Sequence, residues 1–379
     1  MLKRTLQELC LNITDGKHGD CENEENSGYY FISCKDIFDG QINYKNARQI
    51  TKADFEETHK RTMLEVDDIL LTNSGTIGRM AFVTDREATT KTTFQKSVAI
   101  IKPDKQKVLP RYLYYQLQNC VPQFINSSNG SAQKNLLLST MRTFQIEIEE
   151  NCEKQEKIAN TLSAYDDLIE NNQKQIKLLE EAAQRLYKEW FVDLRFPGHE
   201  NTKIVDGVPE GWSRGLLKEL ISVNYGKDHK KAPDDGNIPV YGSGGLMRKC
   251  NKSLFSGEAV LIPRKGSLNN IMYVDETFWT VDTMFYATMK QPHTAIFVYF
   301  FVKAFDMYSM NIGAAVPSMT TKILDAMDVV IPDKETLEKF DKLTKTYFNK
   351  IKTLQGQNER LKIARDLLLP KLMSGEVEV

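Results

Sequence analysis

The sequence predicts an α+β protein in which two similar domains are joined by two long helices, which pair as an antiparallel intramolecular coiled coil with pseudo-twofold symmetry. Two observations predict this fold: short phrases occur twice in the same order, and a heptad pattern of apolar residues follows each copy. The expected organisation is a first domain over residues 1–150, a helix over 151–192, a linker over 193–210, a second domain over 211–334, and a helix with a tail over 335–379.

The composition is that of a globular protein with room for two domains, since 41% of the 379 residues are hydrophobic and 27% are charged. The formal net charge of −1 argues against a simple basic DNA-coating protein, although an acidic face can balance a basic one. The six cysteines are scattered, which indicates reduced thiols and neither a zinc site nor a disulfide framework. The five histidines are equally dispersed, so we expect no metal site. With no signal-peptide pattern and no long apolar run, we expect a soluble cytoplasmic chain.

The internal repeat begins with LQEL at residues 6–9 and LKEL at residues 217–220, a displacement of 211 residues. A Gly-Lys pair follows each phrase, at Gly16-Lys17 and Gly226-Lys227. The displacement falls steadily to 183, so the second copy is 28 residues shorter, and we expect the difference to lie in loops. The later matches join residues 68–71 to 258–261, 75–77 to 266–268, 129–132 to 312–315, and 144–148 to 327–331.

Each copy ends in a heptad seam, in which apolar residues recur at alternating spacings of four and three. At about 33 residues, each helix should be roughly 50 Å long. Pro370 is expected to end or kink the second helix. The first seam comprises Ile158, Leu162, Tyr165, Ile169, Asn172, Ile176, Leu179, Ala183, Leu186 and Trp190, and the second comprises Phe340, Thr344, Tyr347, Ile351, Leu354, Asn358, Leu361, Arg365, Leu368 and Leu372.

An antiparallel alignment of the two seams pairs residues whose numbers add up to 530, and it places Asn172 opposite Asn358. An amide in a coiled-coil seam needs a partner, and an Asn–Asn layer supplies one while fixing the register. We therefore predict that this pair sets the register. The alternative is two unrelated amphipathic helices, each packed on its own domain.

Between the copies lie the phrases WFVDLRFPG at residues 190–198 and VPEGW at 208–212, and the second copy adds IPVYGSGG at 238–245 and FWTVDT at 278–283. With the order domain, helix, domain, helix, these phrases resemble the specificity (S) subunits of type I restriction–modification enzymes. The resemblance covers essentially the whole chain. This sequence departs from the family in being short and in lacking a basic total charge.

The resemblance implies a non-catalytic subunit with two target-recognition domains. Each domain would read one half of a split site in double-stranded DNA, and the helices would act as a ruler between the halves. It also implies two methyltransferase (M) subunits and restriction (R) subunits as partners. Those partners would carry the S-adenosylmethionine, ATP and Mg, so that this chain binds no cofactor of its own.

Residue chemistry then suggests DNA contacts, because Arg, Lys, Asn, Gln, Ser and Thr read base edges, while cations and backbone amides hold phosphates. The loop at residues 72–79 and its counterpart at 264–270 combine glycines with short polar groups, although the first reads equally as an ordinary β-turn. The cluster at 227–231 is the densest basic run, although charge runs are usually solvated surface. The candidates are Lys17, Thr72, Asn73, Ser74, Thr76, Arg79, Lys96 and Lys134 in the first copy, and Lys227, His229, Lys230, Lys231, Tyr241, Arg264, Lys265, Ser267, Asn269 and Asn270 in the second.

Motifs for catalysis are missing from the sequence. Pro-Asp occurs at Pro103, Pro233 and Pro332, but no Glu-x-Lys follows to complete a metal-dependent nuclease core. The glycine-rich residues 242–245 lack the frame of a phosphate-binding loop and are predicted to form a turn. A nuclease or methyltransferase with an unfamiliar active site remains the enzymatic alternative, and a coiled-coil scaffold that binds only proteins is the other.

Overall fold

The computed structural model describes residues 2–85, 87–128, 134–310 and 318–379. The chain divides into two compact units: unit 1 comprises residues up to 171 together with 358–379, and unit 2 comprises residues 172–357. Each long helix therefore contributes one part to each unit. The repeat match between residues 129–132 and 312–315 lies outside the described residues.

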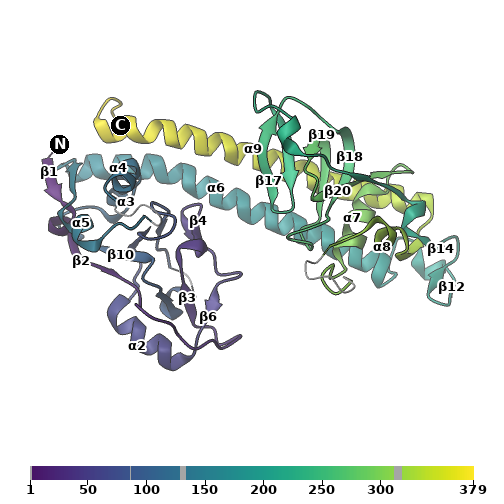
Figure 1. Ribbon diagram of the computed structural model, residues 1–379, viewed down its shortest axis with the longest axis horizontal. Coiled ribbons are helices and arrows are strands. Elements are labelled where there is room, and N and C mark those ends of the chain that lie inside the picture. Colours follow the sequence, from purple (N-terminus) through teal and green to yellow (C-terminus); the bar gives the residue numbers. More distant parts are fainter. Residues whose placement is uncertain (1, 86, 129–133, 311–317) are drawn as a thin grey trace. The chain divides into compact units, whose positions relative to one another are not determined.

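Unit 1 is built on a four-stranded antiparallel sheet in the order β2-β10-β7-β8. Helices α3 and α4 lie beside the first part of α6, and α2 lies at the opposite end of the unit (Figure 1). Its elements before the long helix are β1 (Leu2–Thr5), α1 (Leu6–Leu9), β2 (Cys10–Asp15), β3 (Tyr30–Ile32), β4 (Ile37–Phe38), β5 (Gln41–Ile42), β6 (Arg48–Gln49), α2 (Lys52–Thr62), β7 (Ile69–Thr72), β8 (Met80–Phe82), β9 (Thr92–Phe94), β10 (Val98–Pro103), α3 (Pro110–Asn119), α4 (Val121–Asn126), α5 (Leu138–Thr143) and β11 (Gln145–Ile148).

Unit 2 is built on a six-stranded sheet in the order β15-β20-β18-β19-β16-β17. Strands β16 and β17 form a hairpin in which Gly242 pairs with Gly245, so the glycine-rich phrase is a turn as predicted. The elements are β12 (Ile204–Val205), β13 (Val208–Pro209), β14 (Ser213–Leu216), β15 (Ile221–Tyr225), β16 (Ile238–Gly242), β17 (Gly245–Cys250), β18 (Phe255–Pro263), β19 (Met272–Thr280), β20 (Met284–Met289), α7 (Ala295–Lys303), α8 (Thr321–Asp325) and β21 (Asp328–Ile331).

The two units share the order of their central strands, which confirms the predicted repeat, although unit 1 has separate four- and three-stranded sheets where unit 2 has one six-stranded sheet. The order β2-β10-β7-β8 corresponds to β15-β20-β18-β19, and the pair β1–β11 corresponds to β14–β21. Each unit also has one parallel pair, β3 with β9 and β16 with β19. The expectation that the second copy loses residues only in loops is wrong, because the first copy places helix α2 between β6 and β7, whereas the second passes from β17 directly to β18.

Successive side chains of the central strands point to opposite faces of each sheet, which divides each core into two layers. In β7, Ile69 and Leu71 enter one apolar cluster and Leu70 enters another, as expected when successive side chains point to opposite faces. In β18, Val260 and Leu261 separate in the same way. One layer in each unit includes residues of the long helices. Each sheet is therefore fixed on one face to its own part of the helix pair.

The long helices are α6 (Cys152–Tyr187), which continues into a π-helical turn at Lys188–Val192, and α9 (Lys334–Ser374). They contain 36 and 41 residues, longer than predicted, and so extend about 54 and 62 Å. All residues of both seams are buried or half-buried. Pro370 does not end α9, which continues through it to Ser374. Its missing N–H removes one helical hydrogen bond, to the carbonyl of residue 366, and because Pro370 is exposed one turn from the helix end, only the last four residues of α9 follow it.

The helices run antiparallel within each unit. In unit 1, Arg365 of α9 donates to the carboxylate of Asp166 on α6 (2.5 Å), and Tyr115 of α3 donates to the other oxygen of that carboxylate (2.6 Å). In unit 2, Trp190 near the end of α6 packs on Phe340 near the start of α9, with ring centroids 5.8 Å apart. The charged residue in the second seam thus has a counter-ion, which its sequence position did not reveal.

Both register asparagines are buried, Asn172 at 3% and Asn358 at 8% exposure. Within unit 1, the Asn358 amide donates to the carbonyl of Ile169 (3.5 Å). The Asn172–Asn358 pair itself stays a prediction.

Candidate nucleic-acid interface

In unit 1, four segments that the sequence singled out separately meet at one edge of the sheet. The N–H of Lys96 donates to the carbonyl of Lys17 (3.1 Å). The N–H of Asn73 donates to the carbonyl of Ser97 (3.1 Å), and an isolated bridge joins the first loop to Asn135. The segments are Lys17 after β2, residues 73–79 between β7 and β8, residues 95–97 between β9 and β10, and Asn135 before α5.

Unit 2 builds the same edge from the corresponding segments. The N–H of Lys227 donates to the carbonyl of Thr280 (2.9 Å), just as that of Lys17 donates to Phe94 (2.8 Å) in unit 1. The N–H of Arg264 donates to the carbonyl of Thr283 (2.8 Å). The segments are Lys227 after β15, residues 264–271 between β18 and β19, residues 281–283 between β19 and β20, and Ser318 before α8.

The glycine of each Gly-Lys pair is required by a close backbone approach at this edge. A Cβ on Gly16 would lie 2.0 Å from the carbonyl oxygen of Phe94, and one on Gly226 would lie 2.0 Å from that of Val281. Neither position admits a side chain without moving a neighbouring strand. The Gly-Lys motif of the repeat is therefore explained by packing at the edge where the following lysine lies.

The candidates of the first copy differ in their access to solvent. Thr72 and Asn73 are buried, at 0% and 4% exposure, so neither presents its side chain to a ligand in this conformation. The Thr72 hydroxyl instead donates to the carbonyl of Thr76 (2.5 Å) and accepts from the N–H of Arg79 (2.9 Å), which shapes the loop. The side chains with solvent access at this edge are Ser74, Thr76, Arg79, Lys96 and Lys134.

Lys17 is held by two carboxylates of α2. Its ammonium lies 3.0 Å from Asp54 and 3.2 Å from Glu57. The hydrogen bond to Asp54 raises the pKa of Lys17 to about 12, so the lysine stays charged. The backbone N–H of Glu22 and the Lys17 ammonium together hold the pKa of Asp54 below its usual value. The positive charge of Lys17 is therefore largely compensated within unit 1.

Several candidates of the second copy stabilise the loop that carries them. Asn269 donates to the carboxylate of Asp306 (2.9 Å) and Asn270 to the carbonyl of Ser243 (2.9 Å). Tyr241 is half-buried and donates to Glu276 (2.5 Å). These side chains position the edge. The others, Lys227, His229, Lys230, Lys231, Arg264, Lys265 and Ser267, are exposed or half-exposed.

Two further contacts at these edges were not predicted from the sequence. The N–H of Cys34 donates to the hydroxyl of Ser97 (3.1 Å), which ties the end of β3 to the turn before β10. In unit 2, the ring of Tyr225 lies beneath the guanidinium of Arg264, at 5.6 Å from the Arg264 Cζ to the ring centroid. These residues are brought together by strand pairings between segments far apart in the sequence, β3 with β9 in unit 1 and β15 and β18 with β20 in unit 2. The Gly-Lys pairs were the sequence signal that pointed to this edge.

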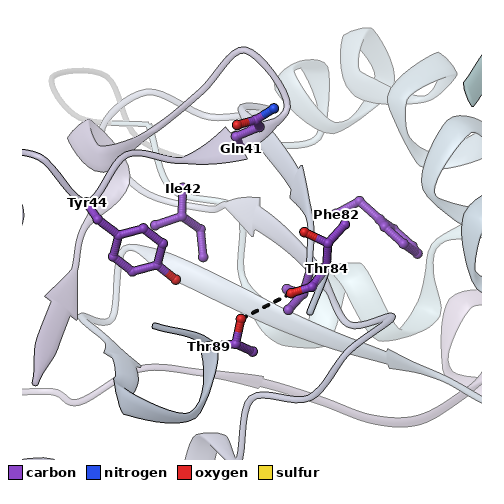
Figure 2. Close-up of a pocket in the computed structure, with 7 residues that line it drawn as sticks. Gln41, Ile42, Tyr44, Phe82, Thr84 and Thr89 are labelled. Carbon is purple, nitrogen blue, oxygen red and sulfur yellow. Dashed lines mark hydrogen bonds between the residues drawn. The ribbon is translucent and has the colours of Figure 1, made fainter. Parts of the chain in front are cut away.

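A separate hollow in unit 1 is lined by Gln41, Ile42, Tyr44, Phe82, Val83, Thr84 and Thr89. Figure 2 shows the hydroxyl of Thr89 donating to the carbonyl of Thr84 (3.1 Å), and the lining holds no carboxylate, histidine, cysteine or lysine. Across the described residues, no cluster of three or more His, Cys, Asp or Glu side chains could bind a metal ion. None of the helices in the described ranges has both the length and the apolar character that a membrane crossing requires.

Comparison with known proteins gives matches along both copies. The family described as the type I restriction modification DNA specificity domain matches residues 3–181 and 209–362. The chain is 27% identical to the type I restriction enzyme MjaIX specificity subunit of Methanocaldococcus jannaschii, over 92% of this chain and 87% of that protein. It is 23% identical to the HindI specificity subunit of Haemophilus influenzae, over 73% and 80%.

A crystal structure of the type I restriction–modification S subunit from M. genitalium has the same fold, with a TM-score of 0.60 and 19% identity over 98% of this chain and 95% of that one. The topology repeated in the two units, the paired long helices and the family match over both copies lead to one assignment. The chain belongs to the family of type I restriction–modification DNA specificity subunits.

Proposed function

We propose that this chain is the non-catalytic DNA-recognition subunit of a type I restriction–modification complex, and that it reads a bipartite site with one unit per half. The observation that carries the proposal is the edge built twice from the same segments, where the exposed polar and cationic candidates gather. Membership of the specificity-subunit family supports the same proposal.

At each edge, phosphate contacts would position the unit and side chains would specify bases. Exposed cations such as Lys96 and Lys265 and the backbone amides of the loops suit phosphates, while Ser74 and Thr76 suit base edges. The two edges carry different side chains at corresponding positions. The two half-sites should therefore differ in sequence, which makes the whole site asymmetric.

The helices would set the gap between the half-sites, and their outer faces would bind two methyltransferase subunits. Leu178 and Leu367 support such a role, because they are 64% and 65% exposed on α6 and α9. S-adenosylmethionine, ATP and Mg would be bound by the methyltransferase and restriction subunits. The complex would act on DNA in the cytoplasm.

The test is selection of the full-length chain, with its methyltransferase subunits, on a library of random DNA duplexes. We expect two short base clusters with a fixed gap, and affinity that falls steeply with salt. Deleting residues 173–179 together with 351–357 removes one heptad from each helix, or about 10 Å, and should shorten the gap by about three base pairs. Deleting one heptad from α6 alone is the control, since it destroys the pairing and should abolish the fixed gap.

Selection of no sequence and absence of salt dependence would instead favour a scaffold that binds only proteins. Cleavage or methylation of DNA by the purified chain alone, with Mg and S-adenosylmethionine, would favour the enzymatic alternative. An unchanged gap after the paired deletion would show that the helices do not set the distance between the half-sites.

A further inference from the structure

We propose that Arg264 reads a guanine in the half-site bound by unit 2, held ready by the ring of Tyr225; this inference rests on the DNA-recognition function proposed above. Arg264 is the first residue after β18. It lies at the edge of unit 2 that is built from the same segments as the corresponding edge of unit 1.

The backbone of Arg264 is fixed on both sides. Its N–H donates to the carbonyl of Thr283 (2.8 Å), and its carbonyl accepts from the N–H of Met319 (2.9 Å). These bonds join the residue to the turn before β20 and to the segment before α8. The starting point of the side chain is therefore set by the sheet, as a precise reading contact requires.

The guanidinium is oriented by stacking. It lies over the ring of Tyr225, and Nη1 donates weakly to the carbonyl of Asp282 (3.4 Å). Tyr225 is itself 54% exposed and packs edge-on against Phe285, with centroids 5.0 Å apart. The guanidinium of Arg264 lies over this exposed ring, and the negative face of the ring attracts its positive charge.

An arginine that stacks through its face keeps the donors on its edge for another ligand. Among the described residues, the carbonyl of Asp282 is the one acceptor of this fork of five N–H donors, so the described residues leave most of the donors unused. Two adjacent N–H groups match O6 and N7 of guanine in the major groove, whereas the other bases do not offer that pair of acceptors. The same fork also fits two oxygens of a phosphate, so the base preference measured for the Arg264 variants distinguishes the two ligands.

Unit 1 has a different residue at the same backbone position. Asn73 donates its N–H to Ser97 (3.1 Å) and accepts from Leu136 (2.8 Å), the same bonds that Arg264 makes in unit 2, but its side chain is 4% exposed. Asp15, which precedes the Gly-Lys pair as Tyr225 does, is buried and bonded to Arg61 (2.5 Å). The guanine contact should therefore exist in one half-site only.

The experiment compares wild type with Arg264→Ala, Arg264→Lys and Lys265→Ala, each as full-length chain with its methyltransferase subunits, selected on random-sequence duplexes. Wild type should prefer guanine at one position of one half-site by roughly 10- to 100-fold. Arg264→Ala should remove that preference and leave all other positions intact. Arg264→Lys keeps the charge but loses the fork, so it should restore the salt dependence of affinity without restoring most of the guanine preference.

The matched control is Lys265, an adjacent exposed cation for which no aromatic ring provides a platform among the described residues. Lys265→Ala should weaken binding to all sequences alike and leave the selected motif unchanged. Tyr225→Leu should reduce the guanine preference, and thermal melting should match wild type in every variant.

Each outcome decides one question. Loss of affinity with an unchanged motif in Arg264→Ala would make Arg264 a phosphate contact and overturn this inference, while the recognition function stands. The same follows if the lost preference is for another base, or if it appears in both half-sites. A wild-type chain that selects no motif would overturn the proposed function itself.

Discussion

The contact between Arg365 and Asp166 tests what holds the helix pair together in unit 1. Burial disfavours the charged guanidinium, but Asp166 more than offsets this and holds the pKa of Arg365 above its usual value. Both side chains are about one-fifth exposed, at 19% and 20%. The perturbation is Asp166→Asn, which leaves the Arg365 charge in the seam with its principal counter-ion removed.

Removing one partner of a buried ion pair costs about 3–5 kcal/mol, and the remaining exposure here brings the expected loss to about 2–3 kcal/mol. Replacing both partners, by Asp166→Leu with Arg365→Met, should come within about 1 kcal/mol of wild type, because no buried charge is then left unpaired. Asp366, which also accepts from Arg365, is 62% exposed and stays solvated. Tyr115→Phe belongs in that variant, since its hydroxyl would otherwise lose its acceptor.

The assay is thermal melting of the full chain, with hydrogen exchange of α6 to assign the loss to unit 1. The pair Lys339–Glu335 serves as control, because it has a similar length (2.7 Å) but side chains that are 50% and 77% exposed. Lys339→Ala should cost only about 0.3–0.5 kcal/mol. Equal effects of Asp166→Asn and Lys339→Ala would show that the Arg365–Asp166 pair contributes no more than a solvent-exposed ion pair.

Three further changes have defined outcomes. Gly226→Ala should disturb the edge of unit 2 and weaken DNA binding at least tenfold in a binding titration, whereas Gly244→Ala, with open space around its Cβ, should leave affinity unchanged. Asn172→Leu with Asn358→Leu should raise the melting temperature and loosen the helix register; a single replacement that alters neither would contradict the predicted pair. Burial raises the pKa of Asp68 to about 6, so the folded chain keeps a proton that the unfolded chain loses, and stability should fall as pH rises from about 4 to 6. Asp68→Asn should flatten that dependence in pH-resolved urea unfolding.

The repeat could be read from the sequence because each copy reuses local signals. The Gly-Lys pairs mark a close approach of strands, and the apolar runs at residues 68–71 and 258–261 become central strands of both sheets. The heptad seams predicted burial at every position, because a 3.5-residue period alone places those side chains on one face. Local patterns thus specified the architecture.

Long-range pairing was beyond such patterns. Lys17 seemed a free cation, but its carboxylate partners lie on α2, 37 and 40 residues later. Asn73 stands in a polar loop and was expected to be exposed, yet it is buried. The segment at Asn135 and Leu136 pairs with that loop. Pairings between distant segments decide which side chains of a loop face solvent, and no period or turn rule encodes them.

The division of the chain also has a consequence for its synthesis. Unit 2 is one continuous stretch and can close once its last residues leave the ribosome, whereas the core of unit 1 includes Leu369, Leu372 and Met373 of α9. The N-terminal part of unit 1 therefore needs residues of α9 before its core is complete, contrary to the usual N-to-C order of domain folding. A premature stop near Gly356 would therefore damage unit 1, and the apolar surface of its N-terminal part stays uncovered until α9 has been synthesised.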